Sequence, residues 1–327
     1  MATPIGVPPR PMGLSEVVGL TYGIYRLRFG RLVKISLVHQ LATLLLLVPL
    51  AAYGMFVIVP EMSLARPVIT SGFAMSSLVG SVVGALLGLG AVVVSVYFLG
   101  LLVHAVNQAM LGLEPTVAEL LALNRGTLRR LGPLYAFATL ACYLVLALGF
   151  APMLRLLPEL VTGISSAGPG FQTMPDALFT KLLTAWGVGM LSVLVLMVAS
   201  GTVAVKLAYI NQVGTVEGKG LMTAVKRAAA LTKGSFWRTA GYLIVLGLAL
   251  GIVQQVVVMV AEAGLLPVMA AMDPRHPEAT VASSAWMYGV LIVLVLALQA
   301  VLEPIMVAFV TVMYADQVRR VDRGPRP

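Results

Sequence analysis

The residue of this sequence with the greatest capacity for chemistry is Glu303, in the stretch "LQAVLEPIMVAFV". It lies in the interior of a long apolar segment, where a carboxyl group must be protonated, paired or in contact with water. Pro304 follows directly and cannot donate a backbone hydrogen bond, so the helical ladder is interrupted there. Lys206, near the end of another apolar segment, is a candidate partner. Three interpretations are open: a proton or ligand site at a helix break, a structural polar clamp between helices, and a side chain that snorkels into a water defect.

Other polar residues in apolar segments extend this candidate site. His104 and Asn107 stand together in "VHAVNQA", and Asn211 stands in "INQV". With Glu303 and Lys206 they form a candidate intramembrane polar site, although interhelical hydrogen bonding and helix capping are the plainer roles for them. The chain has one cysteine and three histidines, without an HxxxH or HExxH pattern. We therefore expect no metal and no other cofactor.

Motifs of soluble enzymes are missing from the sequence. It has no Walker loop, no GxGxxG after a strand and no GxSxG, and no pair of acidic residues stands on a soluble segment. No nucleophile and base are recognisable as a set. We expect a protein without enzymatic activity.

The composition identifies the medium in which these residues act. Hydrophobic residues make up 59% of the 327 residues and charged residues 11%, whereas a soluble chain carries roughly a quarter charged residues. The chain is therefore predicted to be an integral membrane protein. Its net charge is +9, from 22 Lys and Arg against 13 Asp and Glu. In a membrane protein such an excess serves topology and binding of anionic lipid, and we expect no nucleic acid as a partner.

Six segments are apolar and long enough to cross about 30 Å of hydrocarbon as helices. They lie near residues 32–59, 78–111, 131–157, 183–212, 238–263 and 286–314. An even number of spans puts both termini on one side. The loops of the opposite side hold few basic residues: Arg66, Arg155, Lys181 and Arg275. Because Lys and Arg gather on the cytoplasmic side, both termini are predicted to be cytoplasmic, in an inner membrane of bacterial type.

An internal repeat is predicted within a single membrane domain that covers 1–327. The segments 14–38, 115–140 and 220–245 share an opening Ser or Thr, an amphipathic stretch, a basic or aromatic cluster, a Gly and a span. These shared positions are Ser15, Thr116 and Thr223 and then Gly30, Gly132 and Gly241. The predicted hairpin units are approximately 14–112, 113–219 and 220–323, between a Pro-rich tail at 1–13 and a tail at 324–327. Chance similarity among apolar segments is the rival interpretation.

The amphipathic stretches are predicted to be helices that lie at the membrane interface before each hairpin. Thr116 and Glu119 fit a capping box, so at least the second stretch should begin a helix. Basic and aromatic residues at the ends of these stretches are expected to meet lipid headgroups: Arg28, Arg31, Arg129, Arg130, Lys233, Trp237 and Arg238. An ordinary cytoplasmic linker helix packed on the bundle is the alternative.

Three glycines at four-residue spacing, Gly80, Gly84 and Gly88, form a strip that another helix could approach closely. Such a strip serves either packing within the bundle or self-association, and the sequence does not separate these. Gly247 and Gly251 make a weaker pair.

Two stretches carry a resemblance to a known family. "AVKRAAALTKGSFWRTAGYLIVLGLALGI" and "EPIMVAFVTVMYADQVRRVDRG" resemble the membrane domain of the glycerophosphoryl diester phosphodiesterase membrane-domain family and its stand-alone relatives. The matching positions are Arg227, Leu231, Thr232, Lys233, Gly234, Trp237 and Arg238, then Tyr314, Asp316, Arg319 and Arg320. The resemblance implies the membrane fold. It does not imply hydrolase activity, because six spans take up the chain and we expect no phosphodiesterase domain.

The sequence thus favours an all-α protein with six membrane spans that acts as a scaffold or accessory subunit. Its basic cytoplasmic face would engage anionic lipid, a partner membrane protein or a second copy of the chain. The alternative is a transporter or channel that uses a polar path near Glu303, and a membrane-bound enzyme is the third interpretation.

Overall fold

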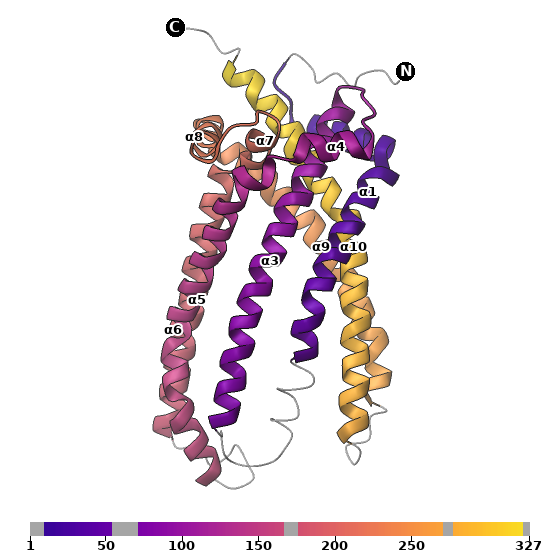
Figure 1. Cartoon of the computed structure of the whole chain (residues 1–327). Helices are drawn as coiled ribbons and strands as arrows, with labels where there is room; N and C mark the ends of the chain where they lie inside the picture. Colours follow the sequence, from indigo (N-terminus) through magenta and orange to yellow (C-terminus); the bar gives the residue numbers. More distant parts are fainter. Residues whose placement is uncertain (1–9, 54–70, 167–175, 271–276, 323–327) are drawn as a thin grey trace. The chain divides into compact units, whose positions relative to one another are not determined.

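In the computed structural model, residues 10–53, 71–166, 176–270 and 277–322 are described, and within them all regular structure is helical. The helices are α1 (Leu14–Tyr53), α3 (Ser71–Met110), α4 (Val117–Asn124), α5 (Thr127–Ser166), α6 (Asp176–Lys206), α7 (Ile210–Thr215), α8 (Leu221–Thr232), α9 (Phe236–Ala270) and α10 (Pro277–Asp322) (Figure 1). The all-α fold class is therefore confirmed.

Six helices in the described part of the chain are long and apolar enough to cross a membrane. These candidate spans are Leu14–Leu46, Val82–Met110, Thr127–Gly149, Phe179–Lys206, Phe236–Gly264 and Gly289–Asp322. The protein is an integral membrane protein, as its composition predicted. The predicted end of the fourth span is wrong: this span ends at Lys206 and not near residue 212, because a turn over 207–209 separates α6 from the short helix α7. The last residues of the first predicted span, 54–59, lie outside the described residues.

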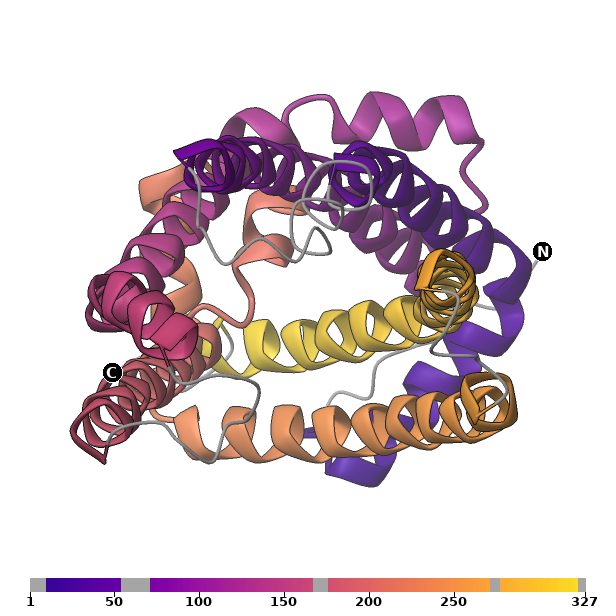
Figure 2. The same cartoon turned by 90° about the horizontal axis from the view of Figure 1, so that it is seen from below.

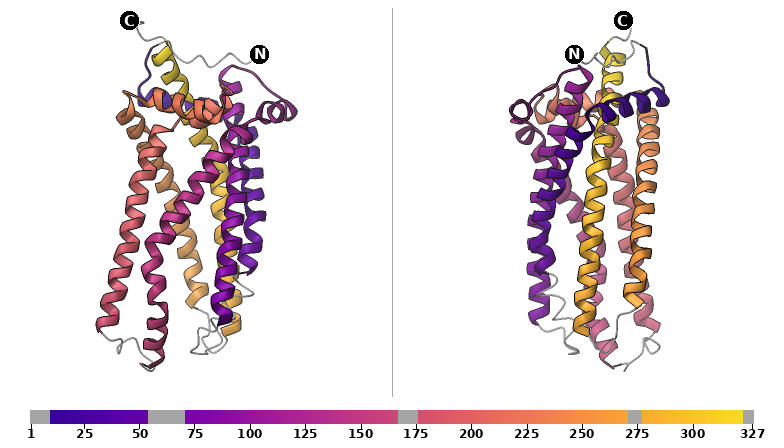
Figure 3. Two further views of the ribbon diagram at one scale, coloured as in Figure 1. Left: turned by 60° about the vertical axis from the view of Figure 1, so that its left-hand side comes forward. Right: turned by 90° about the vertical axis from the view of Figure 1, so that its right-hand side faces the viewer.

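A short helical segment precedes three of the spans. The first belongs to α1, which is broken at Arg28, where φ is −120° and ψ is 17°. The right-hand view of Figure 3 shows the part of α1 before this break turned across the direction of the part that follows. The other two segments are the separate helices α4 and α8, which precede α5 and α9. The break at Arg28 therefore separates a short segment of α1 from the span that follows, just as turns separate α4 from α5 and α8 from α9.

The starts of these segments confirm the one cap that the sequence predicted, whereas the other two shared positions do not begin a helix. The capping box of α4 is present, with Thr116 accepting from the Glu119 amide and Glu119 accepting from the Thr116 amide. Thr223 does not open α8, which begins at Leu221 after an extended Gly220. Ser15 lies inside α1, and the Glu16 carboxylate instead accepts from the Gly13 amide at 2.9 Å. That the segments lie at a membrane interface and belong to a repeat stays a prediction.

The chain forms two compact units. Unit 1 contains residues 1–45, 93–132 and 205–327, and unit 2 contains residues 46–92 and 133–204. In unit 1, α9 packs against α10, and α8 contacts both α7 and α10. Its core holds fully buried apolar side chains: Leu32, Leu102, Val106, Leu131, Leu231, Phe309 and Met313. Unit 1 also contains every residue of the two candidate sites described below.

Segments of unit 2 approach one another closely at glycines. A Cβ atom on Gly80 would lie 2.8 Å from Cε1 of Tyr53, and one on Gly88 would lie 2.5 Å from the hydroxyl of Tyr143. Two positions of the predicted glycine strip therefore make room for tyrosine rings of the same chain. In unit 2, α5 and α6 run side by side (Figures 1 and 2), and a Cβ on Gly149 would lie 2.4 Å from Cβ of Ser192.

Candidate functional site

Glu303 lies on α10 and is the acceptor of a hydrogen-bonded cluster in unit 1. Three residues of α1 donate to its carboxylate: the Ser36 hydroxyl, Nδ1 of His39 at 2.9 Å from Oε1, and Nε2 of Gln40 at 3.2 Å from Oε2. These donors occupy positions i, i+3 and i+4, so a single helical face presents all of them. Both oxygens of the Glu303 carboxyl group are therefore acceptors of this cluster.

His39 extends the cluster to a third helix. Its Nε2 lies 3.1 Å from Oγ of Ser95 on α3, and its ring stacks on Phe98 with centroids 5.3 Å apart. In the tautomer with the proton on Nδ1, Nδ1 donates to Glu303 and Nε2 accepts a hydrogen bond from the Ser95 hydroxyl. The side chains of His39 and Glu303 are only 8% and 12% exposed. Glu303, His39 and Ser95 therefore form a short hydrogen-bonded chain that joins α10, α1 and α3.

The prediction that Lys206 is the partner of Glu303 is wrong. Lys206 is exposed, and its main-chain carbonyl accepts a hydrogen bond from Thr232 at 3.0 Å. Its ammonium makes no ion pair with the described residues. The end of α6 is thus tied to α8, while the face of α1 that carries His39 packs on α10 at Glu303.

The other predicted members of the polar site are not gathered around Glu303. His104 is buried nine residues beyond Ser95 on α3, a displacement of about 13 Å along a helix, and its Nε2 has no hydrogen-bond partner in the described chain. Asn107 lies farther along α3, and Asn211 lies in α7. Ser36, Gln40 and Ser95 are site residues that were not predicted, although the helical spacing of Ser36, His39 and Gln40 is visible in the sequence.

Three of the seven residues predicted to meet lipid form hydrogen bonds or ion pairs within unit 1. Arg238 donates to Asp316 Oδ2 at 2.9 Å, Arg130 donates to the Gly214 carbonyl at 3.4 Å, and Arg28 pairs with Glu114. Arg31, Arg129 and Lys233 have no hydrogen bond or ion pair to side chains in the described ranges, and Trp237 is 83% exposed. The kink of α1 and the starts of α5 and α9 lie at the same end of unit 1 as α4, α7 and α8 (Figures 1 and 3). We call the three unpaired cations together with Trp237 the basic face.

Asp316 is the centre of the ion-pair network beside this face. It is 3% exposed and accepts from Arg238, from Nε of Arg320 at 2.8 Å and from the main-chain amide of Met12 at 3.1 Å. The neighbouring Gln317 donates to the carbonyl of Leu231 at 2.8 Å. Asp316 thus joins the residues before α1, the start of α9 and the end of α10.

Glu217 forms a second acidic centre in the loop between α7 and α8. It accepts from the Tyr314 hydroxyl at 2.7 Å and pairs with Lys219 at 2.5 Å, while Arg227 lies 3.5 Å away and pairs with Asp322 at 2.9 Å. Burial by itself raises the pKa of Glu217, but the hydrogen bonds from Lys219 and Tyr314 and the charges of Lys219 and Arg227 hold the pKa below its usual value. The carboxylate is therefore ionised at neutral pH.

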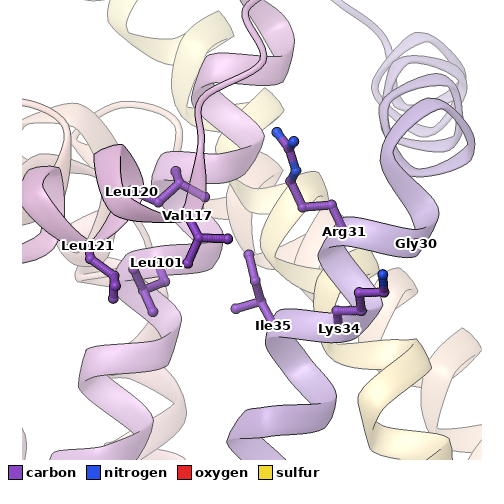
Figure 4. A pocket seen from close by; sticks show the side chains of 8 residues that line it. All are labelled: Gly30, Arg31, Lys34, Ile35, Leu101, Val117, Leu120 and Leu121. Carbon is purple, nitrogen blue, oxygen red and sulfur yellow. The ribbon is translucent and has the colours of Figure 1, made fainter.

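A cavity of about 430 Å³ lies in unit 1 between α1, α3 and α4. It is lined by Gly30, Arg31, Lys34, Ile35, Leu101, Val117, Leu120 and Leu121 (Figure 4). Arg31 and Lys34 stand on the α1 side, and leucine and valine side chains stand on the opposite side.

Comparison with family models, with curated proteins and with solved structures found no match to this chain. The function is therefore argued from the geometry of unit 1.

Proposed function

We propose that this membrane protein is a non-enzymatic scaffold or accessory subunit whose basic face engages anionic lipid and presents the bundle to a partner. The observation that supports the proposal is the set of unpaired cations, Arg31, Arg129 and Lys233, beside the exposed indole of Trp237. Cations without a carboxylate partner attract anionic headgroups, and an exposed tryptophan favours the headgroup layer. On this proposal the basic face is cytoplasmic, and the chain is a stand-alone relative of the family that it resembles.

Lipid-dependent stability tests the proposal. The protein is reconstituted into nanodiscs of phosphatidylcholine alone or with phosphatidylglycerol, and the midpoint of thermal unfolding is measured. Anionic lipid is expected to raise the midpoint of the wild type, and Arg129→Gln with Lys233→Gln is expected to remove part of that rise. The matched control neutralises Arg66 and Arg275, which the sequence places in the opposite loops. Equal midpoints in both lipids, or equal losses in both double variants, would overturn the proposal.

Proton-coupled transport is the second candidate function, and the chain of Glu303, His39 and Ser95 favours it. Buried titratable groups that share hydrogen bonds inside a span are the usual parts of a proton path. In vesicles that contain a pH-sensitive dye, a potassium diffusion potential should drive proton entry faster with the wild type than with Glu303→Gln. Proton entry at the rate of protein-free vesicles would eliminate this candidate.

A further inference from the structure

The cavity between α1, α3 and α4 combines two chemistries on opposite sides. Arg31 and Lys34 are three residues apart on α1, so they share one face of the helix. Figure 4 shows both side chains on the α1 side of the cavity, with Ile35 between them and Val117 of α4. The remaining lining side chains are aliphatic: Leu101, Val117, Leu120 and Leu121.

No carboxylate among the described residues pairs with the cationic side of the cavity. The nearby carboxylate of Glu114 is engaged by Arg28, and the hydrogen bond from Arg28, followed by its charge, lowers the pKa of Glu114. The charge of Arg31 lowers the pKa of Glu114 as well, though less than Arg28 does, so this one carboxylate is shared by two cations. Arg31 and Lys34 have neither a hydrogen bond nor an ion pair with any side chain that the structure describes, which leaves an excess of positive charge at the cavity. Guanidinium and ammonium groups together are a common recognition set for phosphate.

The aliphatic side of the cavity is partly uncovered. Val117 is 70% exposed and Leu121 40% exposed, while the capping box fixes where α4 begins. Beside Gly30 no atom lies within 4 Å of the position that a Cβ would take, so the α1 side is open as well. A small soluble anion would satisfy Arg31 and leave these aliphatic side chains uncovered. An acyl chain would cover them.

We propose that this cavity binds one anionic phospholipid, with its phosphate on Arg31 and Lys34 and the upper part of an acyl chain along Val117, Leu101 and Leu121. The inference rests on the proposed function and deepens it, because it replaces a general attraction of the basic face by one site. The volume of about 430 Å³ lies in the range of small-ligand sites, roughly 300–1,000 Å³. The cavity therefore holds the headgroup and the first part of a chain, and the rest of the lipid extends into the bilayer.

Native mass spectrometry of the delipidated full chain, titrated with phosphatidylglycerol, tests the site. The wild type is expected to show one tight binding step. Each cation near an anionic headgroup contributes roughly fivefold in affinity, so Arg31→Gln with Lys34→Gln should weaken the step about 25-fold. Val117→Asp should weaken it as well, because it sets a carboxylate opposite the cations. Since an acidic residue is favourable in the first turn of a helix, this variant should keep α4 folded.

The matched control is Arg129→Gln with Lys233→Gln, which removes two charges of the basic face and leaves the cavity unchanged. A tight step that persists in the Arg31/Lys34 and Val117 variants would overturn the site. An equal loss of affinity in the control variant would also overturn the site, but the proposed attraction of lipid to the basic face would then stand. The proposed function fails separately, if phosphatidylglycerol and phosphatidylcholine bind alike to all variants.

Soluble glycerol phosphate distinguishes the two sources of a phosphate group. If the site takes a lipid, glycerol phosphate should not displace phosphatidylglycerol at equal concentration. Displacement at equal concentration would show that the acyl chain contributes nothing, and it would overturn the assignment to a lipid.

Discussion

Arg238 in the first turn of α9 and Asp316 near the end of α10 form an ion pair of 2.9 Å, and the carboxylate of Asp316 is 4% exposed. A buried carboxylate is costly unless its lone pairs are satisfied. Asp316 meets this condition with Arg238, Arg320 and the amide of Met12. The pair therefore fixes the entry to α9 against the exit of α10, and it explains why Arg238 is not available to lipid.

Asp316→Asn should destabilise the protein. The substitution removes the charge that Arg238 and Arg320 share, so two cations are left close together without a counter-charge. Loss of one partner of a fully buried pair costs roughly 3–5 kcal/mol, and the partial exposure of both arginines reduces the expected cost to about 2 kcal/mol. Thermal unfolding in non-ionic detergent measures the effect. Lys226→Gln, an exposed residue of α8, is the control and should leave the midpoint unchanged; equal midpoints for both variants would contradict the prediction.

Glu303→Gln should destabilise unit 1 although it conserves size. Three donors converge on the carboxylate, and an amide offers one oxygen, so its NH₂ group would face at least one of Ser36, His39 and Gln40. A buried group left without a partner costs about 1–3 kcal/mol. Thermal unfolding in non-ionic detergent is again the measurement.

Glu262→Gln is the matched control for this substitution, because Glu262 is exposed on α9. If Glu303→Gln unfolds with the midpoint of the wild type and of Glu262→Gln, the cluster does not stabilise the fold. If Glu303→Gln is destabilised and also loses proton flux at a temperature where it is folded, the cluster both stabilises the fold and carries protons.

The sequence predicted those features of the fold that depend on local pattern. Hydropathy over one segment is enough to locate a span, and the spacing of Thr116 and Glu119 is enough to locate a capped helix. It did not predict the turn after Lys206, because an apolar run continues through that turn and a hydropathy window does not detect it.

Only one side of the candidate site, the carboxyl group of Glu303, could be predicted from the sequence. The sequence identifies Glu303 as an interior carboxyl group that needs a partner. It does not identify His39, because 264 residues separate the two and no local signal says which face of which helix lies opposite. Its opposite charge makes Lys206 the candidate partner of Glu303 in the sequence. In the structure the partners of Glu303 are instead hydrogen-bond donors on one face of α1, namely Ser36, His39 and Gln40.

Glycine substitutions in unit 2 should have opposite effects at two positions. In Gly149→Ala the new Cβ would lie 2.4 Å from Cβ of Ser192, so α5 and α6 must move apart, at a cost of roughly 1–3 kcal/mol. In Gly187→Ala no atom lies within 4 Å of the new Cβ, and the higher helix propensity of alanine should stabilise α6 by up to about 1 kcal/mol. Thermal unfolding of both variants is the measurement. Gly149→Ala with Ser192→Gly should recover most of the loss, and a failure to recover would show that α5 and α6 do not meet there.

Glu217 predicts a dependence of stability on pH. Its pKa is lower in the folded protein than the ordinary value of 4.5, because Lys219, Tyr314 and Arg227 outweigh the effect of burial. A depressed pKa adds stability that is present above the unfolded pKa and is lost as the pH falls through the folded pKa. Hydrogen bonds to a charged group are worth roughly 1.5–3 kcal/mol each, so Glu217→Gln should be less stable than the wild type at pH 7 by about 2 kcal/mol.

The difference between the two proteins should begin to shrink as the pH falls below about 4.5, where the carboxylate of the unfolded chain is protonated. It should be lost as the pH falls through the lower pKa of Glu217 in the folded protein. Thermal unfolding between pH 7 and pH 3 in non-ionic detergent measures this difference. Glu262→Gln serves as the control, because its exposed carboxylate has no ion pair among the described residues and should give no difference at either pH. A gap between Glu217→Gln and the wild type that stays constant down to pH 3 would show that the charge of Glu217 does not stabilise the loop between α7 and α8.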